Sequence, residues 1–156
     1  MMMKRFLKNE RGLTLIELLA VVVILGIIAA IAITAIGAII DNSKKDAHIA
    51  NAKQMVSAAR MAVTADRNTK TSYTMKELYD AGYLENIPKS PGKKSEEYDP
   101  SKSKVTISKV DIKDNNNQKI GDKLVYRVTL VDSDGSFKYI DNEDVNELER
   151  SNVTLE

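Results

Sequence analysis

One acidic side chain stands inside an apolar stretch near the start of the chain. Glu17 follows Leu15 and Ile16 and precedes 23 uncharged residues, 18–40. An ionised side chain costs about 2.5 to 3.5 kcal/mol near the bilayer centre and less near its edge, and such residues commonly mark function. The chemistry that this placement indicates is charge pairing with a cation in an apolar medium. A carboxylate that merely reaches the lipid headgroups is the alternative.

The remaining residues of the sequence do not form a recognisable catalytic pattern. His48 is the only histidine and the chain has no cysteine, so a zinc site, a cysteine nucleophile and a disulfide framework are all unsupported. No serine stands in a recognisable triad, and no phosphate-binding or dinucleotide-binding glycine motif occurs. We therefore expect no enzyme and no cofactor, and we expect His48 to lie in solvent or at an interface.

A late acidic loop superficially resembles a calcium site. Asp132 and Asp134 stand beside Gly135 and Ser136. The glycine is misplaced for an EF-hand loop, which needs it at position six, and an Asp-Gly pair is typical of a hairpin turn. The turn is the favoured interpretation. Calcium bound by Asp132 and Asp134 is the alternative, and no other metal site is expected.

The apolar stretch predicts a membrane-spanning helix. At 1.5 Å per residue, residues 18–40 give about 35 Å of helix, enough for about 30 Å of hydrocarbon, and the stretch contains no proline. Four basic residues precede it: Lys4, Arg5, Lys8 and Arg11. By the positive-inside rule the N-terminus stays cytoplasmic, so everything after Ile40 is delivered to the outside.

Two simpler interpretations of the same pattern are a secretory signal peptide and an uncut signal anchor. A signal peptide cut after Ala30 or Ala32 is conceivable, but its apolar core normally spans only about 7 to 15 residues. An uncut anchor needs only hydropathy. Neither interpretation accounts for the acid at Glu17.

The residues around Glu17 make the signal specific. The string Arg11-Gly12-Leu13-Thr14-Leu15-Ile16-Glu17, followed by the long apolar stretch, resembles the class III signal of type IV prepilins and of the pseudopilins of type II secretion systems. The resemblance implies that a membrane peptidase cuts between Gly12 and Leu13 and that the new N-terminus is methylated. Residues 1–12 are then a cleaved leader. Its removal frees an α-amine on Leu13, which can pair with Glu17 of the same helix or of a neighbouring subunit.

Small residues repeat along the same stretch at every fourth position. They are Gly26, Ala30, Thr34 and Ala38. A stripe of small side chains lets helices approach closely in an apolar medium, although glycine and alanine are also simply common in membrane helices. Two positions depart from the family pattern: Leu13 replaces the more usual phenylalanine, and Thr34 stands where many pilins have proline. Threonine keeps its backbone N–H, so the helix is not forced to break.

The exported part predicts one more stretch of helix and a small sheet. Five apolar residues continue a three-four spacing that is typical of an amphipathic helix: Ile49, Ala52, Val56, Ala59 and Val63. One helix is therefore expected over residues 13–65. Thr74 and Glu77 fit a capping box that starts a short helix ending near Ala81. Three strands follow, around 105–112, 124–131 and 137–140, with turns at 114–117 and 132–135.

The predicted fold is α+β. A long N-terminal helical spine, transmembrane in its first half, packs against a small antiparallel sheet, which is the pilin fold by resemblance. The expected divisions of the chain are as follows: a leader at 1–12, the transmembrane and assembly half at 13–40, the amphipathic outer half at 41–66, a connecting region at 67–103, and the antiparallel meander with its tail at 104–156.

Charge is unevenly distributed over the exported part. Residues 41–109 hold 13 basic and 9 acidic residues, whereas residues 110–156 hold 6 basic and 11 acidic ones. Complementary contacts between neighbouring subunits are one interpretation, and an ordinary solvated surface is the other. The net charge of the whole chain is only +1, so nucleic acid is not an expected partner.

These features predict a structural subunit of a type IV pilus-like filament. By resemblance it is stored in the cytoplasmic membrane with its N-terminus inside, processed by the prepilin peptidase, and assembled with copies of itself into a surface filament for motility, adhesion or attachment. The assembly requires a membrane platform and a cytoplasmic ATPase that acts through it. A pseudopilin of a type II secretion or DNA-uptake apparatus is one alternative. A single-pass anchored binding domain is the alternative from another class.

Overall fold

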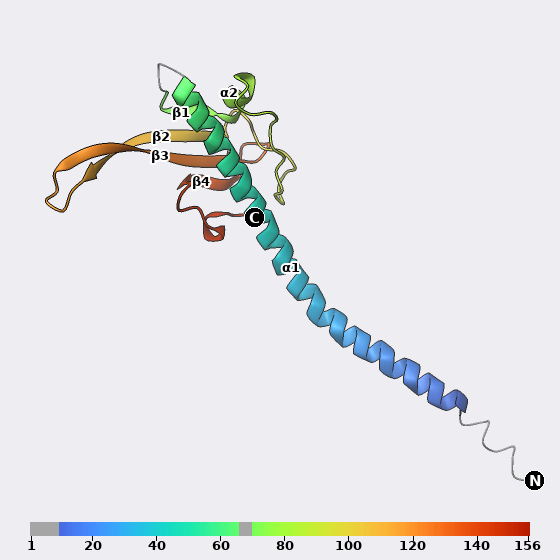
Figure 1. Cartoon of the computed structure of the whole chain (residues 1–156). Coiled ribbons are helices and arrows are strands. Elements are labelled where there is room, and N and C mark those ends of the chain that lie inside the picture. The colour runs from blue at the N-terminus through green and yellow to red at the C-terminus, as the bar shows by residue number, and fades with distance from the viewer. Residues whose placement is uncertain (1–9, 66–69) are drawn as a thin grey trace, which may run out of the picture. The chain divides into compact units, whose positions relative to one another are not determined.

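The computed structural model of the protein describes residues 10–65 and 70–156, and the side chains among these from Thr14 onward (Figure 1). The predicted α+β architecture, with a long N-terminal helix and a small antiparallel sheet, is confirmed. The elements are α1 (Glu10–Ala65), β1 (Ser72–Thr74), α2 (Met75–Asp80), β2 (Lys104–Lys113), β3 (Lys119–Val131), β4 (Lys138–Asp144) and the 3-10 turn η2 (Arg150–Asn152). The chain divides into two compact units, Met1–Ile40 and Asp41–Glu156.

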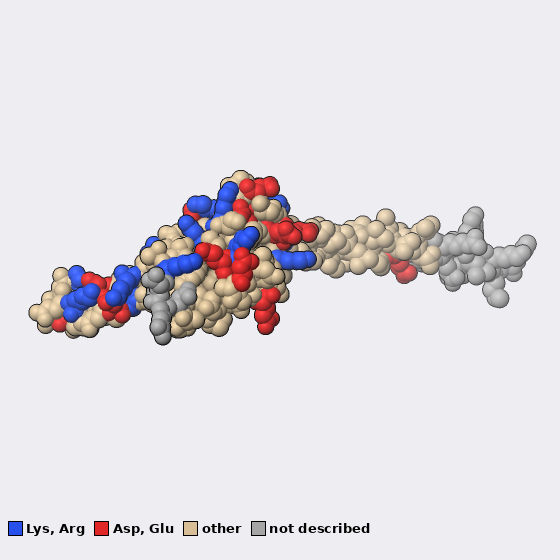
Figure 2. Space-filling view, turned by 90° about the horizontal axis from the view of Figure 1, so that it is seen from above, with Lys and Arg blue, Asp and Glu red and all other residues tan. Residues whose placement is uncertain are grey.

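In the first unit, α1 is covered by no other part of the described chain. The large apolar side chains from Leu15 to Ile40 are 49% to 70% exposed. The most apolar 18-residue window of the helix has a mean hydropathy of 3.1, so the helix is long and apolar enough to cross a membrane. Figure 2 shows the surface of this segment almost entirely as uncharged atoms. An apolar surface of this extent requires lipid or other helices around it.

In the second unit, the outer part of α1 lies against one face of the sheet. The predicted amphipathic seam is confirmed: Ala52, Val56 and Ala59 are fully buried, and Ile49 and Val63 are packed at the edge of the core. The buried stripe is wider than the seam, since four more residues of the helix are buried: His48, Met55, Ala58 and Ala62. Four of these seven buried residues are alanines.

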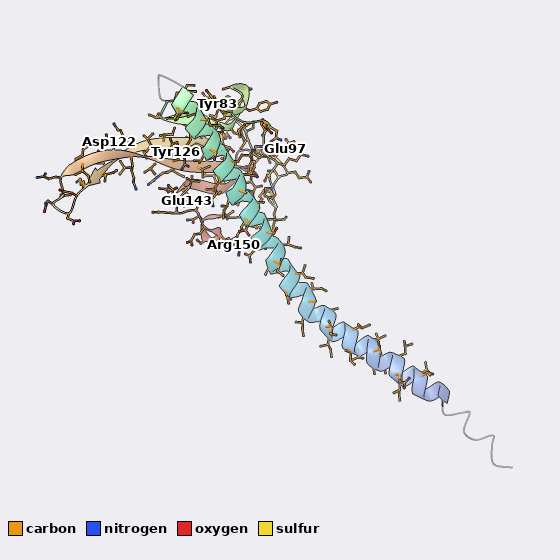
Figure 3. The ribbon with its side chains drawn as sticks, in the orientation of Figure 1. Tyr83, Glu97, Asp122, Tyr126, Glu143 and Arg150 are labelled. Carbon is orange, nitrogen blue, oxygen red and sulfur yellow. The ribbon has the colours of Figure 1, made fainter. Side chains whose placement is uncertain are left out.

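The sheet is antiparallel throughout, in the order β1-β2-β3-β4. Cross-strand pairs that face α1 are apolar and buried, as with Val105 opposite Val128 and Ile107 opposite Tyr126. Residues in between point to the other face because side chains alternate along a strand. Figure 3 shows Tyr126 against α1 and Asp122 away from it, on an arm where β2 and β3 continue as a two-stranded ribbon.

Three parts of the sheet differ from the sequence prediction. Strand β4 runs from Lys138 to Asp144 rather than over 137–140. The three-residue strand β1 is absent from the prediction and pairs with the start of β2, Tyr73 opposite Val105. Strand β3 begins at Lys119 rather than at Leu124. All three differences have the same cause: these segments are short or exposed, so pairing with a neighbouring strand rather than an apolar pattern makes them strands.

The predicted capping box at the start of α2 is confirmed. The Thr74 hydroxyl oxygen accepts a hydrogen bond from the Glu77 N–H at 3.1 Å, and the Thr74 N–H donates to Glu77 Oε2 at 2.8 Å. The carboxylate of Glu77 also pairs with Lys70 at 3.2 Å. These bonds, led by that from the Thr74 N–H, lower the pKa of Glu77. The helix ends at Asp80, and Gly82 follows with a φ of 77°, as expected for a glycine stop.

The C-terminal tail folds back on the second unit. Thr154 N–H donates to the Tyr139 carbonyl oxygen on β4 at 2.9 Å. Arg150 forms a two-pronged ion pair with Asp46 of α1, both contacts at 2.7 Å. Lys93 bridges Asp41 at 3.2 Å and Glu156 at 2.7 Å. These pairs are exposed, so they fix the path of the tail more than they stabilise the fold.

Candidate functional site

The predicted processing residues lie in the first turns of α1. The helix includes Gly12, Leu13 and Glu17, and Glu17 is exposed. Residues 1–9 of the predicted leader, and the side chain of Leu13, lie outside what the structure describes. Cleavage between Gly12 and Leu13 and methylation of Leu13 therefore stay predictions, as does the pairing of the Leu13 amine with Glu17.

The surroundings of Glu17 explain why its partner matters. Residues 14–40 contain no lysine, arginine or histidine, so no side chain of this apolar segment can neutralise the carboxylate. A counter-charge must come from the N-terminal side of Glu17 or from another molecule. An uncompensated charge in an apolar medium is strongly destabilising. The released amine of Leu13, one helical turn away, is the nearest cation that processing would supply.

The small-residue positions lie on a continuous helix. Gly26, Ala30, Thr34 and Ala38 all fall within α1, which runs unbroken past them. The Thr34 hydroxyl donates to the Ile31 carbonyl oxygen at 2.9 Å, so this polar group is satisfied within its own helix. A Cβ atom added at Gly26 would meet no atom within 4 Å. No contact within the described chain therefore requires glycine there, and the stripe stays open to a neighbouring helix.

The prediction for His48 is wrong. Its side chain is fully buried between α1 and the rest of the second unit, not in solvent or at an interface between molecules. Nδ1 lies 2.7 Å from the Tyr98 hydroxyl, and the ring stacks on Tyr139 with centroids 4.3 Å apart. Nε2 has no hydrogen-bond partner among the residues that the structure describes. The flanking Ala47 and Ile49 gave no sign of this burial, because the two tyrosines come from distant segments of the chain.

Burial changes the chemistry of His48. Burial, together with the smaller effect of the nearby Lys44 ammonium, lowers the pKa of the imidazole to about 4. The groups that face the ring are the hydroxyl of Tyr98 and the ring of Tyr139, neither of which carries a charge at neutral pH. Burial also raises the pKa of Tyr98. His48 is therefore a neutral core residue at neutral pH.

We predict an acid sensitivity of the second unit that depends on His48. An imidazole with a pKa near 6.5 when unfolded and about 4 when folded takes up its proton preferentially in the unfolded state. The neutral imidazole therefore contributes its full stabilisation above pH 6.5. As the pH falls toward 4, the free energy of unfolding decreases by about 3 kcal/mol. Urea unfolding of residues 41–156 at pH 7.5, 5 and 4 measures this loss.

The matched control for this prediction is His48→Gln, which keeps a polar side chain but does not titrate. The carboxylates are the same in both proteins, so the difference between their pH profiles isolates the histidine. The wild type should lose stability more steeply below pH 6.5. Parallel profiles would contradict the assignment.

The late acidic loop is a turn, as favoured from the sequence. Asp132 Oδ1 accepts hydrogen bonds from the N–H groups of Ser136 and Phe137 at 2.9 and 3.0 Å. Gly135 has a φ of 73°, which a side chain would strain. The carboxylate of Asp132 is buried and used by this turn. Among the described residues, no group of three or more His, Cys, Asp or Glu side chains lies close enough to hold a metal ion.

Comparison with known families bears on the N-terminal segment. The family model described as the prokaryotic N-terminal methylation motif matches residues 7–33. This motif is the class III prepilin signal of type IV pilins and pseudopilins. The match includes Gly12, Leu13, Glu17 and Gly26, and it leaves the second unit unmatched. Searches among curated proteins and among solved structures found no match.

Proposed function

We propose that this protein is a structural subunit of a helical, type IV pilus-like filament. The proposal is supported by its prepilin-type signal, which type IV pilins and pseudopilins also carry. The subunit is stored in the membrane through α1, cut between Gly12 and Leu13, methylated on Leu13, and added to a growing filament of identical subunits. It has no catalytic function. The observation that carries the proposal is the methylation motif on a helix whose apolar surface nothing else in the described chain covers.

The exposed apolar surface supports a bundle of like helices. In the membrane this surface is satisfied by lipid, so leaving the bilayer requires an equally apolar replacement. Copies of the same helix supply that replacement, and the open stripe at Gly26 and Ala30 lets two helices come close. A single-pass anchored domain would need only the lipid, and it would have no use for the cleavage signal or for Glu17.

The charge of Glu17 supports addition in a fixed register. Once the leader is removed, each subunit carries one cation at Leu13 and one anion at Glu17 at nearly the same depth. A pair formed between two subunits satisfies the anion of one with the cation of the other. Because the apolar segment offers no other cation, a subunit displaced along the helix axis leaves both charges unpaired. The pairing therefore selects one axial position.

The proposal implies a set of partners and a route. A prepilin peptidase removes the leader, and a membrane platform driven by a cytoplasmic ATPase lifts the subunit from the bilayer. The N-terminus lies inside before assembly, and the second unit lies outside. The filament then serves attachment or motility. A pseudopilin of a secretion or DNA-uptake apparatus would use the same processing and the same charge pair in a shorter filament.

The intact mass of the membrane-extracted protein tests processing. Coexpressed with a prepilin peptidase, the chain is expected to lose residues 1–12 and to gain one methyl group. Without the peptidase, the full-length mass is expected. Gly12→Leu serves as the control, since a bulky side chain at the cut position should leave the leader in place. A chain that keeps its leader beside an active peptidase would contradict the proposal and favour the anchored domain.

A further inference from the structure

The face of the sheet that points away from α1 carries a row of basic side chains. Lys104 pairs with Thr129, Arg127 with Thr106 and Lys123 with Val110. These pairs alternate with the buried pairs that face the helix, so all three cations project to the outer face. The row runs from Lys123 to Lys104, whose partner on β3 is Thr129. Lys123 and Thr129 are six positions apart, which corresponds to about 20 Å along the strand.

The basic side chains on the two faces of this sheet differ in their ion pairing. On the face toward α1, the ammonium of Lys109 pairs with Asp122 at 2.8 Å, and that of Lys119 pairs with Asp111 at 2.8 Å and with Asp122 at 2.6 Å. On the outer face, Lys104, Lys123 and Arg127 form no ion pair within the described part of the chain. The nearest acid by strand register is Asp144, opposite Arg127. The outer row therefore keeps a net positive charge that an external partner can meet, with Asp144 as the acid beside Arg127.

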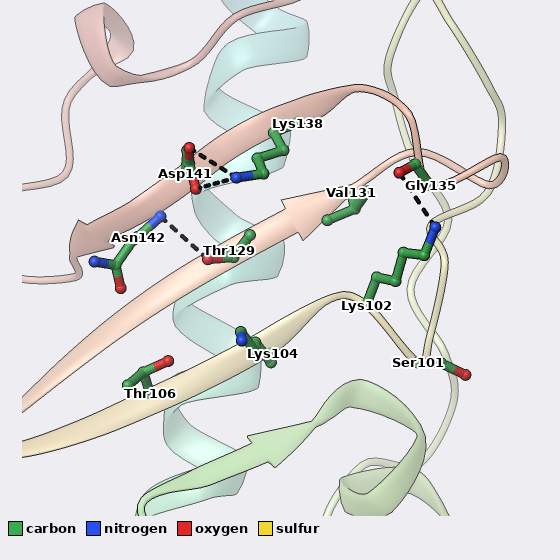
Figure 4. Close-up of a pocket in the computed structure, with 10 residues that line it drawn as sticks. All are labelled: Ser101, Lys102, Lys104, Thr106, Thr129, Val131, Gly135, Lys138, Asp141 and Asn142. Atoms are coloured by element: carbon green, nitrogen blue, oxygen red, sulfur yellow. Dashed lines mark hydrogen bonds and ion pairs between the residues drawn. The ribbon is translucent and has the colours of Figure 1, made fainter.

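At one end the row enters a groove of about 490 Å³. The groove is lined by Lys104 and Thr106 of β2, by Lys102 of the loop before β2, and by Lys138 of β4 (Figure 4). The lysines of the groove differ in their contacts. Lys138 is held by Asp141 through two contacts of 2.9 Å, and Lys102 donates to the Gly135 carbonyl oxygen at 3.3 Å. Lys104 has no such partner among the described residues.

Hydrogen-bonding groups complete the groove. Asn142 has a φ of 54°, a conformation that few residues other than glycine adopt. Its N–H donates to the Thr129 hydroxyl oxygen at 3.1 Å, which holds this backbone in place. Figure 4 shows the Asn142 side chain lining the groove beside Thr129. The groove thus combines ammonium groups with neutral donors. Asp141 is the one acid among its lining residues.

We propose that this face binds an extended polymer that carries phosphate charges and no nucleic-acid bases. A row of about 20 Å exceeds the reach of one small anion, which favours a chain of repeated charges. Most of the cations are lysines, which act as compact point charges and suit phosphate, whereas flat carboxylates favour the paired contacts of arginine. No aromatic residue lines the groove, so it offers no surface on which nucleic-acid bases would stack.

The test uses the full chain in uncharged detergent micelles and inorganic polyphosphate as the probe. Titration at low and at physiological salt gives the dissociation constant. Lys104→Gln combined with Arg127→Gln is expected to weaken binding at least tenfold. The matched control, Lys109→Gln with Lys119→Gln, removes the same charge from the other face and is expected to change affinity less than twofold. Thermal unfolding of both double variants verifies that they fold.

A third variant tests the groove by gain of affinity. Asp141→Asn removes the carboxylate that pairs with Lys138, which leaves the Lys138 ammonium free to contact phosphate. The affinity for polyphosphate should therefore rise about threefold. An equal loss in the two double variants would show attraction by overall charge and overturn the proposal. So would tighter binding of polygalacturonate, which carries carboxylates, or of a thymidine oligonucleotide with the same number of charges. All measurements use unassembled protein, so they stand apart from whether the chain forms filaments.

Discussion

Filament assembly is expected to fall at least a hundredfold when Glu17 is replaced by alanine, while cleavage after Gly12 continues. The carboxylate is the one anion in an apolar segment without cations. Its removal leaves the amine of Leu13 unpaired when the helices come together. Breaking a buried pair by removing one partner costs about 3 to 5 kcal/mol, and 1.4 kcal/mol is a factor of ten in an equilibrium constant. Sedimentation of sheared filaments, with quantification of the membrane pool, measures the change.

Two controls separate charge from shape at this position. Ile16→Ala removes apolar surface next to Glu17 and should reduce assembly far less. Glu17→Gln keeps the size of the side chain but loses the charge, so it should resemble Glu17→Ala. If both Glu17 variants build normal amounts of filament, the pairing of Leu13 with Glu17 is not what selects the subunit register.

The second large effect concerns the stability of the second unit, Asp41–Glu156. Tyr139→Ala is expected to destabilise it by about 3 to 5 kcal/mol, a large part of the 5 to 15 kcal/mol that a domain of this kind possesses. Tyr139 is completely buried. Its ring stacks on His48 and meets Tyr98 and Phe137 edge-on, and its hydroxyl accepts a hydrogen bond from the Ser95 N–H at 3.0 Å. Urea unfolding of residues 41–156 at pH 7.5 gives the free energy.

Tyr79→Ala is the matched control, because Tyr79 is 44% exposed and its loss should cost less than 1 kcal/mol. Tyr139→Phe adds an intermediate case: it keeps the ring contacts and loses the bond from Ser95, at a cost of about 1 kcal/mol. If the free energies of Tyr139→Ala and Tyr79→Ala agree, the aromatic cluster is not the centre of the core.

Local patterns were sufficient to predict the helices. The uncharged run after Glu17 and the spacing from Ile49 to Val63 predict α1, since both depend only on residues that are neighbours along one helix. The same holds for the capping box of Thr74 and Glu77, which satisfies two backbone donors within four residues. In these segments the sequence neighbours are also the structural neighbours.

Contacts between distant segments could not be predicted in the same way. The environment of His48 is formed by Tyr98 and Tyr139, which follow it by 50 and 91 positions, and no local pattern links them. Strand β1 depends on pairing with β2, not on its own three residues. The groove beside Lys104 needs the register of three strands. The proposed assembly residues could be suggested from the sequence because they are neighbours along a single helix, and their role stays a prediction.

The two edges of the sheet restrict how the second units of different copies can associate. At one edge β1 has only three residues, and at the other the tail bonds to β4 through Thr154. Unpaired strand edges are templates for aggregation, and shortened or covered edges prevent it. Many copies can therefore accumulate side by side without exchanging strands. In the function proposed above, association is then left to the first unit, and removal of the leader is the enzymatic step that would control polymer growth.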